Sequence, residues 1–182
     1  MLRIAFTGHR PEKLPGGYDW NSKKNQTLLN VIEKIVLYLT SKEQSFCIYT
    51  GGALGIDQMV ASRFQNIESP KNIYNHIAIP FHKELHCSKW EKPDQERYFK
   101  ILKDADDVIQ VDLIQHYNYK CLEGYHKEKL DQRNRYMVDN CHLLIAIWDG
   151  SPSGTKNCVD YALKCGKMII IINPQNYLIR RI

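Results

Sequence analysis

Two glycine-rich turns, each lying between an apolar strand pattern and a helical pattern, have residue types suited to binding an anion. One covers residues 50–57 and the other residues 148–155. Glycine lets the backbone approach a ligand closely, and the first N–H groups of a helix point at an anion from the positive end of the helix dipole. Neither turn has the Lys-Ser/Thr of a P-loop or the spacing of a dinucleotide fingerprint, so they do not indicate ATP hydrolysis. The candidate binding residues in these turns are Gly51, Gly52, Ala53, Gly55, Asp57, Trp148, Asp149, Gly150, Gly154 and Thr155.

A third turn, Thr7-Gly8-His9-Arg10, follows the first apolar run and adds positive charge. The Arg10 guanidinium is expected to hold a phosphate bidentately or to pair with a local carboxylate. His9 can hydrogen-bond or stack, and Tyr18 can fold its ring over a base. The residue types therefore indicate a phosphate site with an aromatic partner.

Three further polar side chains each leave two interpretations open. Asp57 would repel a close phosphate, so it either accepts hydrogen bonds from ribose hydroxyls or stabilises the helix N-terminus. Asn134 falls on an otherwise apolar helical stripe, and buried amides are usually paired, so Asn134 and the adjacent Arg133 either brace a loop or reach the ligand. The other members of that stripe are Leu130, Met137, Val138 and Cys141.

A metal site is the weaker interpretation of the histidines in residues 81–87. His82 and His86 would share a helix face with Cys87 nearby, but no other ligand pair has recognisable spacing, and a solvated helix start fits better. We expect neither a metal nor a cofactor. Trp90 is expected to be a core or rim aromatic residue rather than a stacking platform.

The elements that must position these turns alternate between strand and helix patterns. A helical period is clearest over residues 28–39, and alternation of this kind predicts an α/β fold with a mostly parallel sheet and helices on both faces. Ligands of such sheets bind beyond the carboxyl ends of the strands, where the three turns lie. The expected strands cover residues 2–7, 46–50, 76–80, 108–111, 143–148 and 168–172, the last apolar throughout as if buried on both sides.

Length and composition agree with one globular domain over residues 1–182. The chain is 43% hydrophobic and 25% charged, with a formal net charge of +5, which suits an anionic ligand without requiring one. No apolar stretch is long enough for a membrane span, and we expect a cytoplasmic protein. The six cysteines contain no C-x-x-C pair and are expected to be reduced core thiols. Residues 113–126, with several tyrosines and histidines, are either a lid or a surface loop.

The ordered combination of these motifs resembles the YpsA-like branch of the SLOG superfamily. The resemblance covers nearly the whole chain, and it implies a Rossmann-like fold with a nucleotide-type ligand in the cleft. That superfamily includes LOG-type phosphoribohydrolases, the DNA-processing protein DprA and sensor domains for NAD-derived signalling nucleotides. The matching segments are Thr7 to Pro11, Gly51 to Asp57, Arg133-Asn134 with Met137 to Asp139, and Trp148 to Gly150 with Gly154-Thr155.

One departure from the resemblance bears on activity. LOG-type hydrolases carry a Gly-Gly-x-Gly-Thr-x-x-Glu motif whose Glu takes part in N-glycosidic cleavage, whereas here Gly154-Thr155 is followed by Lys156, Asn157 and Cys158. Without that acid, hydrolysis needs Asp57 or Asp149 as a substitute. The chain is therefore expected to bind rather than to cleave.

We expect a module that binds an NAD-like, ADP-ribose-like or cyclic signalling nucleotide, with phosphates on the glycine turns and the base near His9, Tyr18 or Trp148. A binding domain without an effector would sense the nucleotide for a partner or sequester it, for example an immune signal removed by a virus. The alternatives are a nucleoside-monophosphate phosphoribohydrolase and a DprA-like single-stranded DNA-binding protein, the latter disfavoured because no basic stripe is interleaved with aromatics. A homo-oligomer is expected, with the apolar helix face of residues 32–39 as one possible contact.

Overall fold

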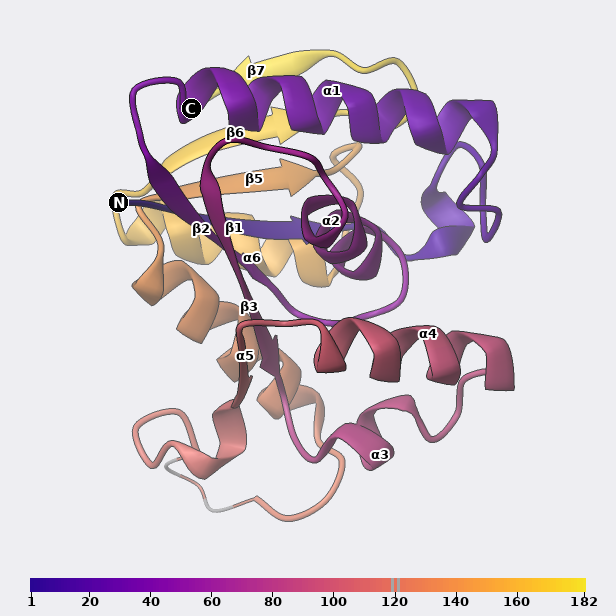
Figure 1. Cartoon of the computed structure of the whole chain (residues 1–182). Coiled ribbons are helices and arrows are strands. Elements are labelled where there is room, and N and C mark those ends of the chain that lie inside the picture. The colour runs from indigo at the N-terminus through magenta and orange to yellow at the C-terminus, as the bar shows by residue number, and fades with distance from the viewer. Residues whose placement is uncertain (119, 121) are drawn as a thin grey trace.

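The computed structural model describes residues 1–118, 120 and 122–182, which form a seven-stranded sheet flanked by helices (Figure 1). Tyr119 and Cys121 lie outside the described residues. The strands are β1 (Leu2–Gly8), β2 (Ser45–Thr50), β3 (Asn72–Ile79), β4 (Asp107–Gln110), β5 (Leu143–Ile147), β6 (Met168–Ile172) and β7 (Ile179–Arg181). The α-helices are α1 (Lys23–Leu39), α2 (Ile56–Gln65), α3 (Lys83–Cys87), α4 (Lys92–Lys103), α5 (Lys127–Asn140) and α6 (Gly154–Lys164), with short 3-10 helices η1 (Pro11–Lys13) and η2 (Val111–Leu113).

The strand order is β4-β3-β2-β1-β5-β6-β7, and all neighbours pair in parallel except β6 and β7. The predicted mostly parallel α/β sheet is therefore confirmed. The direction of the strand order reverses at β1. From β1 the chain continues through β2, β3 and β4 toward one edge of the sheet, whereas β5 pairs with the opposite side of β1 and the chain continues toward the other edge. Crevices beyond the carboxyl ends of strands at such a reversal are the usual ligand sites of this architecture.

Two hydrophobic clusters show why helices cover both faces of the sheet. Ile4 and Phe6 of β1 pack with α1 and α2, whereas Ala5, between them, packs with α5 and α6. Successive strand residues point to opposite faces, so a strand buried on both sides needs apolar residues at every position. In Figure 1, α1 and α2 lie on one side of the sheet and α6 on the other.

Most strand boundaries lie within one residue of the predicted ones, and two differences are larger. β3 begins at Asn72 rather than at residue 76, because its polar first half pairs with β2 along the whole register from Ser45 to Thr50. β7 was not predicted at all: its three residues are exposed and pair antiparallel with β6. Met168 is 41% exposed, so the last parallel strand is not buried along its full length as predicted.

Two other predictions on burial need correction. Cys165 is exposed because it follows the end of α6, although Cys47, Cys87, Cys141 and Cys158 are buried as predicted. His86 is buried rather than on a solvated helix start, because it packs among the aromatic rings beneath α3. None of the helices in the described part of the chain is long and apolar enough to cross a membrane.

Candidate functional site

A cleft of about 430 Å³ opens at the carboxyl end of β1, between α5 and the N-terminus of α6. It lies on the side of β1 where the strand order reverses, as expected for a parallel sheet. The predicted site residues that line it are Thr7, Gly8, His9, Arg10, Ala53, Asp57, Arg133, Asn134, Gly154 and Thr155. The three turns singled out from the sequence thus meet at one cavity.

Arg10 is the side chain in this cleft best placed for an incoming anion. It is exposed to the cleft, and no hydrogen bond or ion pair joins its guanidinium to another described side chain. Partial desolvation lowers the pKa of Arg10, Asp57 opposes that change and Arg133 adds to it. Two guanidinium groups share the vicinity of one carboxylate, so the cleft floor keeps net positive charge.

Arg133 and Asp57 form a buried ion pair at the base of the cleft. The Nη1 group of Arg133, on α5, donates to the Oδ2 atom of Asp57, on α2, at 3.2 Å. Burial raises the pKa of Asp57, while Arg133 and Arg10 oppose that rise, so the ionised form depends on these two cations. Gly51 makes the pair possible, because a Cβ atom there would lie 1.3 Å from Arg133 Nη1.

The two helix N-termini near the cleft differ in how many of their N–H groups are already used. At α2, the Ile56 N–H donates to the His9 carbonyl, and the Asp57 carboxylate accepts from the Ala53 N–H. Asp57 thus already supplies the anion that this helix dipole favours, which agrees with the helix-stabilising interpretation of this residue. At α6, Gly154 and Thr155 begin the helix and line the cleft, and the Ser153 hydroxyl accepts from the Lys156 N–H, so the first two N–H groups of α6 are the ones left for an anion.

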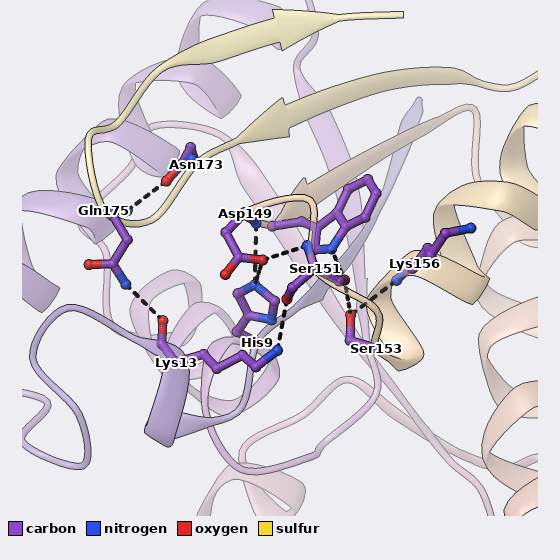
Figure 2. A network of polar contacts seen from close by, with 9 residues as sticks. His9, Lys13, Asp149, Ser151, Ser153, Lys156, Asn173 and Gln175 are labelled. Atoms are coloured by element: carbon purple, nitrogen blue, oxygen red, sulfur yellow. Dashed lines mark hydrogen bonds and ion pairs between the residues drawn. The ribbon is translucent and has the colours of Figure 1, made fainter.

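A polar network fixes the two loops that frame the α6 end of the cleft (Figure 2). The buried His9 Nε2 lies 2.8 Å from Asp149 Oδ1, and the Ser151 N–H donates to the same oxygen at 2.9 Å. Lys13 Nζ donates to Ser151 Oγ at 2.7 Å. The loop after β1 is therefore tied to the loop after β5, and His9 positions these loops rather than presenting a free ring to a base.

The hydrogen bonds around Asp149 also set its charge. Burial raises the pKa of Asp149, but hydrogen bonds from Ser151 and His9 outweigh that effect and hold the pKa well below its usual range. Asp149 is therefore ionised at neutral pH and cannot donate a proton as a general acid.

Some predicted site residues lie away from the cleft. Tyr18 is 54% exposed and donates to Glu12 Oε1. Gly55 supports packing, because a Cβ atom there would lie 2.4 Å from the His9 carbonyl oxygen, and Gly52 faces Tyr98 and the core. Trp148, Asp149 and Gly150 line a separate cavity of about 160 Å³ with Asn173, Asn176 and Arg180.

Several cleft residues were not among the predicted binding residues. Glu12, Lys13 and Leu130 line it, and so does Ser153, which caps α6 by accepting a hydrogen bond from the Lys156 N–H. The helix-cap signal of a serine before Gly154 was present in the sequence, whereas the approach of η1 to the cleft depends on tertiary contacts. Asn134 lines the cleft without a side-chain hydrogen bond to a described residue, which favours the ligand-reaching interpretation.

Residues 113–126 are anchored where the structure describes them. Tyr117 packs against Tyr136 and donates to Asp139 Oδ2 at 2.8 Å. Asn118 donates to the Asp112 carbonyl at 3.0 Å.

Among the residues described, no three His, Cys, Asp or Glu side chains cluster as metal ligands would.

Comparison with known proteins agrees with this architecture. The family model YpsA, described as the YspA SLOG family, matches residues 4–172. The chain is 34% identical over 147 residues to the uncharacterized SPbeta prophage-derived protein YoqJ of Bacillus subtilis (strain 168), covering 78% of this chain and 85% of that protein.

Two solved structures of DNA processing protein A share the fold. The Streptococcus pneumoniae protein superposes with a TM-score of 0.61 at 19% identity, and the Helicobacter pylori protein, described for its single-stranded DNA binding mode, with a TM-score of 0.56 at 15% identity. Each match covers 94% of this chain but only 50% and 65% of those chains, respectively. The family match and the YoqJ relative together show that the chain belongs to the YpsA family of SLOG proteins.

Proposed function

We propose that this protein binds an anionic, ribose-bearing nucleotide in the cleft at the end of β1. The observation that carries the proposal is Arg10, which has no side-chain partner among the described residues and lies in the same cavity as the open N-terminus of α6. A guanidinium and a helix N-terminus are the two protein groups that most favour phosphate. SLOG membership and the DprA-like fold also favour a nucleotide or nucleic-acid ligand.

The proposal is binding without turnover, as a sensor or as a protein that sequesters an NAD-derived or cyclic signalling nucleotide. Both carboxylates that could replace the LOG-type glutamate are engaged: Asp57 by Arg133, and Asp149 by His9 and Ser151. Release of a base needs a carboxyl group that is free to move a proton or to face the sugar. Retention of an intact nucleotide therefore fits these contacts better than hydrolysis does.

Native mass spectrometry and titration calorimetry test this proposal with AMP, NAD, ADP-ribose and cyclic ADP-ribose. Arg10→Ala should weaken binding by about 1.5–3 kcal/mol, or roughly tenfold to a hundredfold, because a charge-assisted phosphate contact is lost. The matched control is Lys164→Ala, which removes the same charge from the exposed far end of α6. Equal affinities of the two variants, or no binding by the wild type, would count against the proposal.

Two further measurements on the same protein test the other candidate functions. A phosphoribohydrolase would release free base, with loss of that activity in Asp149→Asn. Single-stranded DNA binding, the property described for the Helicobacter pylori protein, would appear as oligonucleotide affinity that falls steeply with salt.

A further inference from the structure

A second cavity lies beside the cleft on the side of α3. It measures about 300 Å³ and shares Arg10 and Leu130 with the cleft. Arg10 is therefore within reach of a ligand in either cavity. We call this cavity the aromatic chamber; its remaining lining residues are Leu85, His86, Ser88, Lys89, Trp90 and Tyr125.

Two flat rings in the chamber are held in place by edge-on packing. The Trp90 ring centroid lies 5.1 Å from that of His86 and 5.1 Å from that of Tyr98. The Tyr125 ring packs edge-on against Phe81 at 5.6 Å, yet Tyr125 remains 57% exposed. Aromatic rings at such positions can stack on a flat ligand, and every nucleobase offers a flat π-face.

His86 adds a polar group that lacks a partner among the described residues. It is 8% exposed, its Nδ1 atom lies 2.9 Å from the Tyr98 hydroxyl, and its Nε2 atom has no hydrogen-bond partner there. Burial lowers the pKa of His86 well below its usual value, and the nearby Arg133 and Arg10 lower it further, so the ring is neutral. Because that Nε2 atom is buried, His86 contributes to the chamber by packing against the Trp90 ring rather than by a polar contact to the ligand.

The Trp148 cavity is a weaker candidate for the same role. It has about half the volume, at about 160 Å³, and shares no lining residue with the cleft. The Trp148 indole N–H already donates to the Ser151 carbonyl at 2.7 Å. The aromatic chamber thus adjoins the cleft at Arg10, whereas no lining side chain joins the cleft to the Trp148 cavity.

We propose that the aromatic chamber is the base subsite of the nucleotide cleft. The heteroaromatic base of a nucleoside 5′-phosphate stacks against Trp90 and Tyr125. This assignment rests on the proposed function, because it requires the phosphate to lie at Arg10 and the α6 N-terminus. It replaces His9, Tyr18 and Trp148 as the expected base contacts.

The test compares a ligand with a base to one without, using titration calorimetry on the full chain. The probes are the four ribonucleoside 5′-monophosphates and ribose 5-phosphate. Tyr125→Ala should weaken the best nucleotide by about tenfold, the loss expected for one stacking contact, and leave ribose 5-phosphate unchanged. Tyr38→Ala is the matched control, because Tyr38 is 79% exposed on α1, away from both cavities.

Trp90→Leu is the second variant and keeps an apolar side chain in the half-buried position. It should also weaken nucleotides selectively, and its thermal unfolding midpoint shows that it folds. If the wild type binds nucleotides and ribose 5-phosphate but neither variant distinguishes them, the base subsite is wrong while the proposed function stands. If the wild type binds none of the probes, both proposals are overturned.

Discussion

Replacing Gly51 with Ala tests the buried pair beneath the cleft. A Cβ atom at Gly51 would lie 1.3 Å from Arg133 Nη1 and 2.5 Å from Asp57 Oδ2, so both partners must move. The backbone of Gly51 is not left-handed, so the substitution adds no backbone strain of its own. The cost is therefore that of separating Arg133 from Asp57, which are each 6% exposed.

The size of this effect follows from the burial of both groups. Removing one partner of a buried pair costs about 3–5 kcal/mol, because the other charge is left unpaired. Arg133 is displaced rather than deleted and can turn toward the cleft, so we expect the lower end, about 3 kcal/mol. For a chain of this length, the corresponding fall in melting temperature is roughly 6–12 °C. Urea unfolding followed by circular dichroism measures the free energy, and the denaturant slope should stay unchanged.

A double-mutant cycle assigns the loss to the pair. If Gly51→Ala acts through Arg133, combining it with Arg133→Ala should cost little more than Arg133→Ala alone. The matched control is Gly154→Ala, where a Cβ atom meets nothing within 4 Å and which should stay within about 1 kcal/mol of the wild type. Additive losses in the double variant, or a wild-type stability for Gly51→Ala, would refute the reasoning.

Three further perturbations test charge and capping. Burial keeps His86 neutral in the folded state, whereas in the unfolded state it is protonated below a pKa of about 6.5. The free energy of unfolding should therefore fall by up to about 1.4 kcal/mol per pH unit below that value. Urea unfolding at several pH values should show a weaker pH dependence for His86→Phe. Lys129 Nζ lies 2.8 Å from Asp112 Oδ2. Lys129→Met leaves that carboxylate unpaired and should lower the free energy of unfolding by about 3 kcal/mol. An unchanged free energy of unfolding would mean that water replaces the lysine. Ser153→Ala removes the cap that accepts from the Lys156 N–H and should cost about 1 kcal/mol in thermal unfolding, with no loss if water caps α6 equally well.

Local sequence patterns determined the class of fold and the position of the glycine turns. The central strands contain apolar residues at successive positions, as in Leu143 to Ile147, and this pattern follows from burial on both faces of a parallel sheet. Thr7, Arg10 and Gly154 could be predicted at one cleft because parallel strands bring their carboxyl ends to the same edge. These features depend on residues close together in the chain or on a general rule of topology.

Contacts between distant residues were decided only by the tertiary structure. Arg133 on α5 pairs with Asp57 on α2. From the sequence, the Asp57 carboxylate could have accepted hydrogen bonds from a ribose, but in the structure it is the partner of a buried guanidinium. β7 escaped prediction because a short exposed edge strand has neither an apolar face nor an alternating pattern.

The aromatic chamber is the clearest case of what the sequence alone does not contain. Trp90 and Tyr125 come from different segments and have no shared spacing, yet they line one chamber with His86. Periodicity reports which face of an element is buried, whereas a cavity depends on how side chains from several elements fail to fill the space between them. The sequence therefore determined the position of the glycine turns, whereas the packing of α3 and of the segment before α5 formed the chamber that we propose for the base.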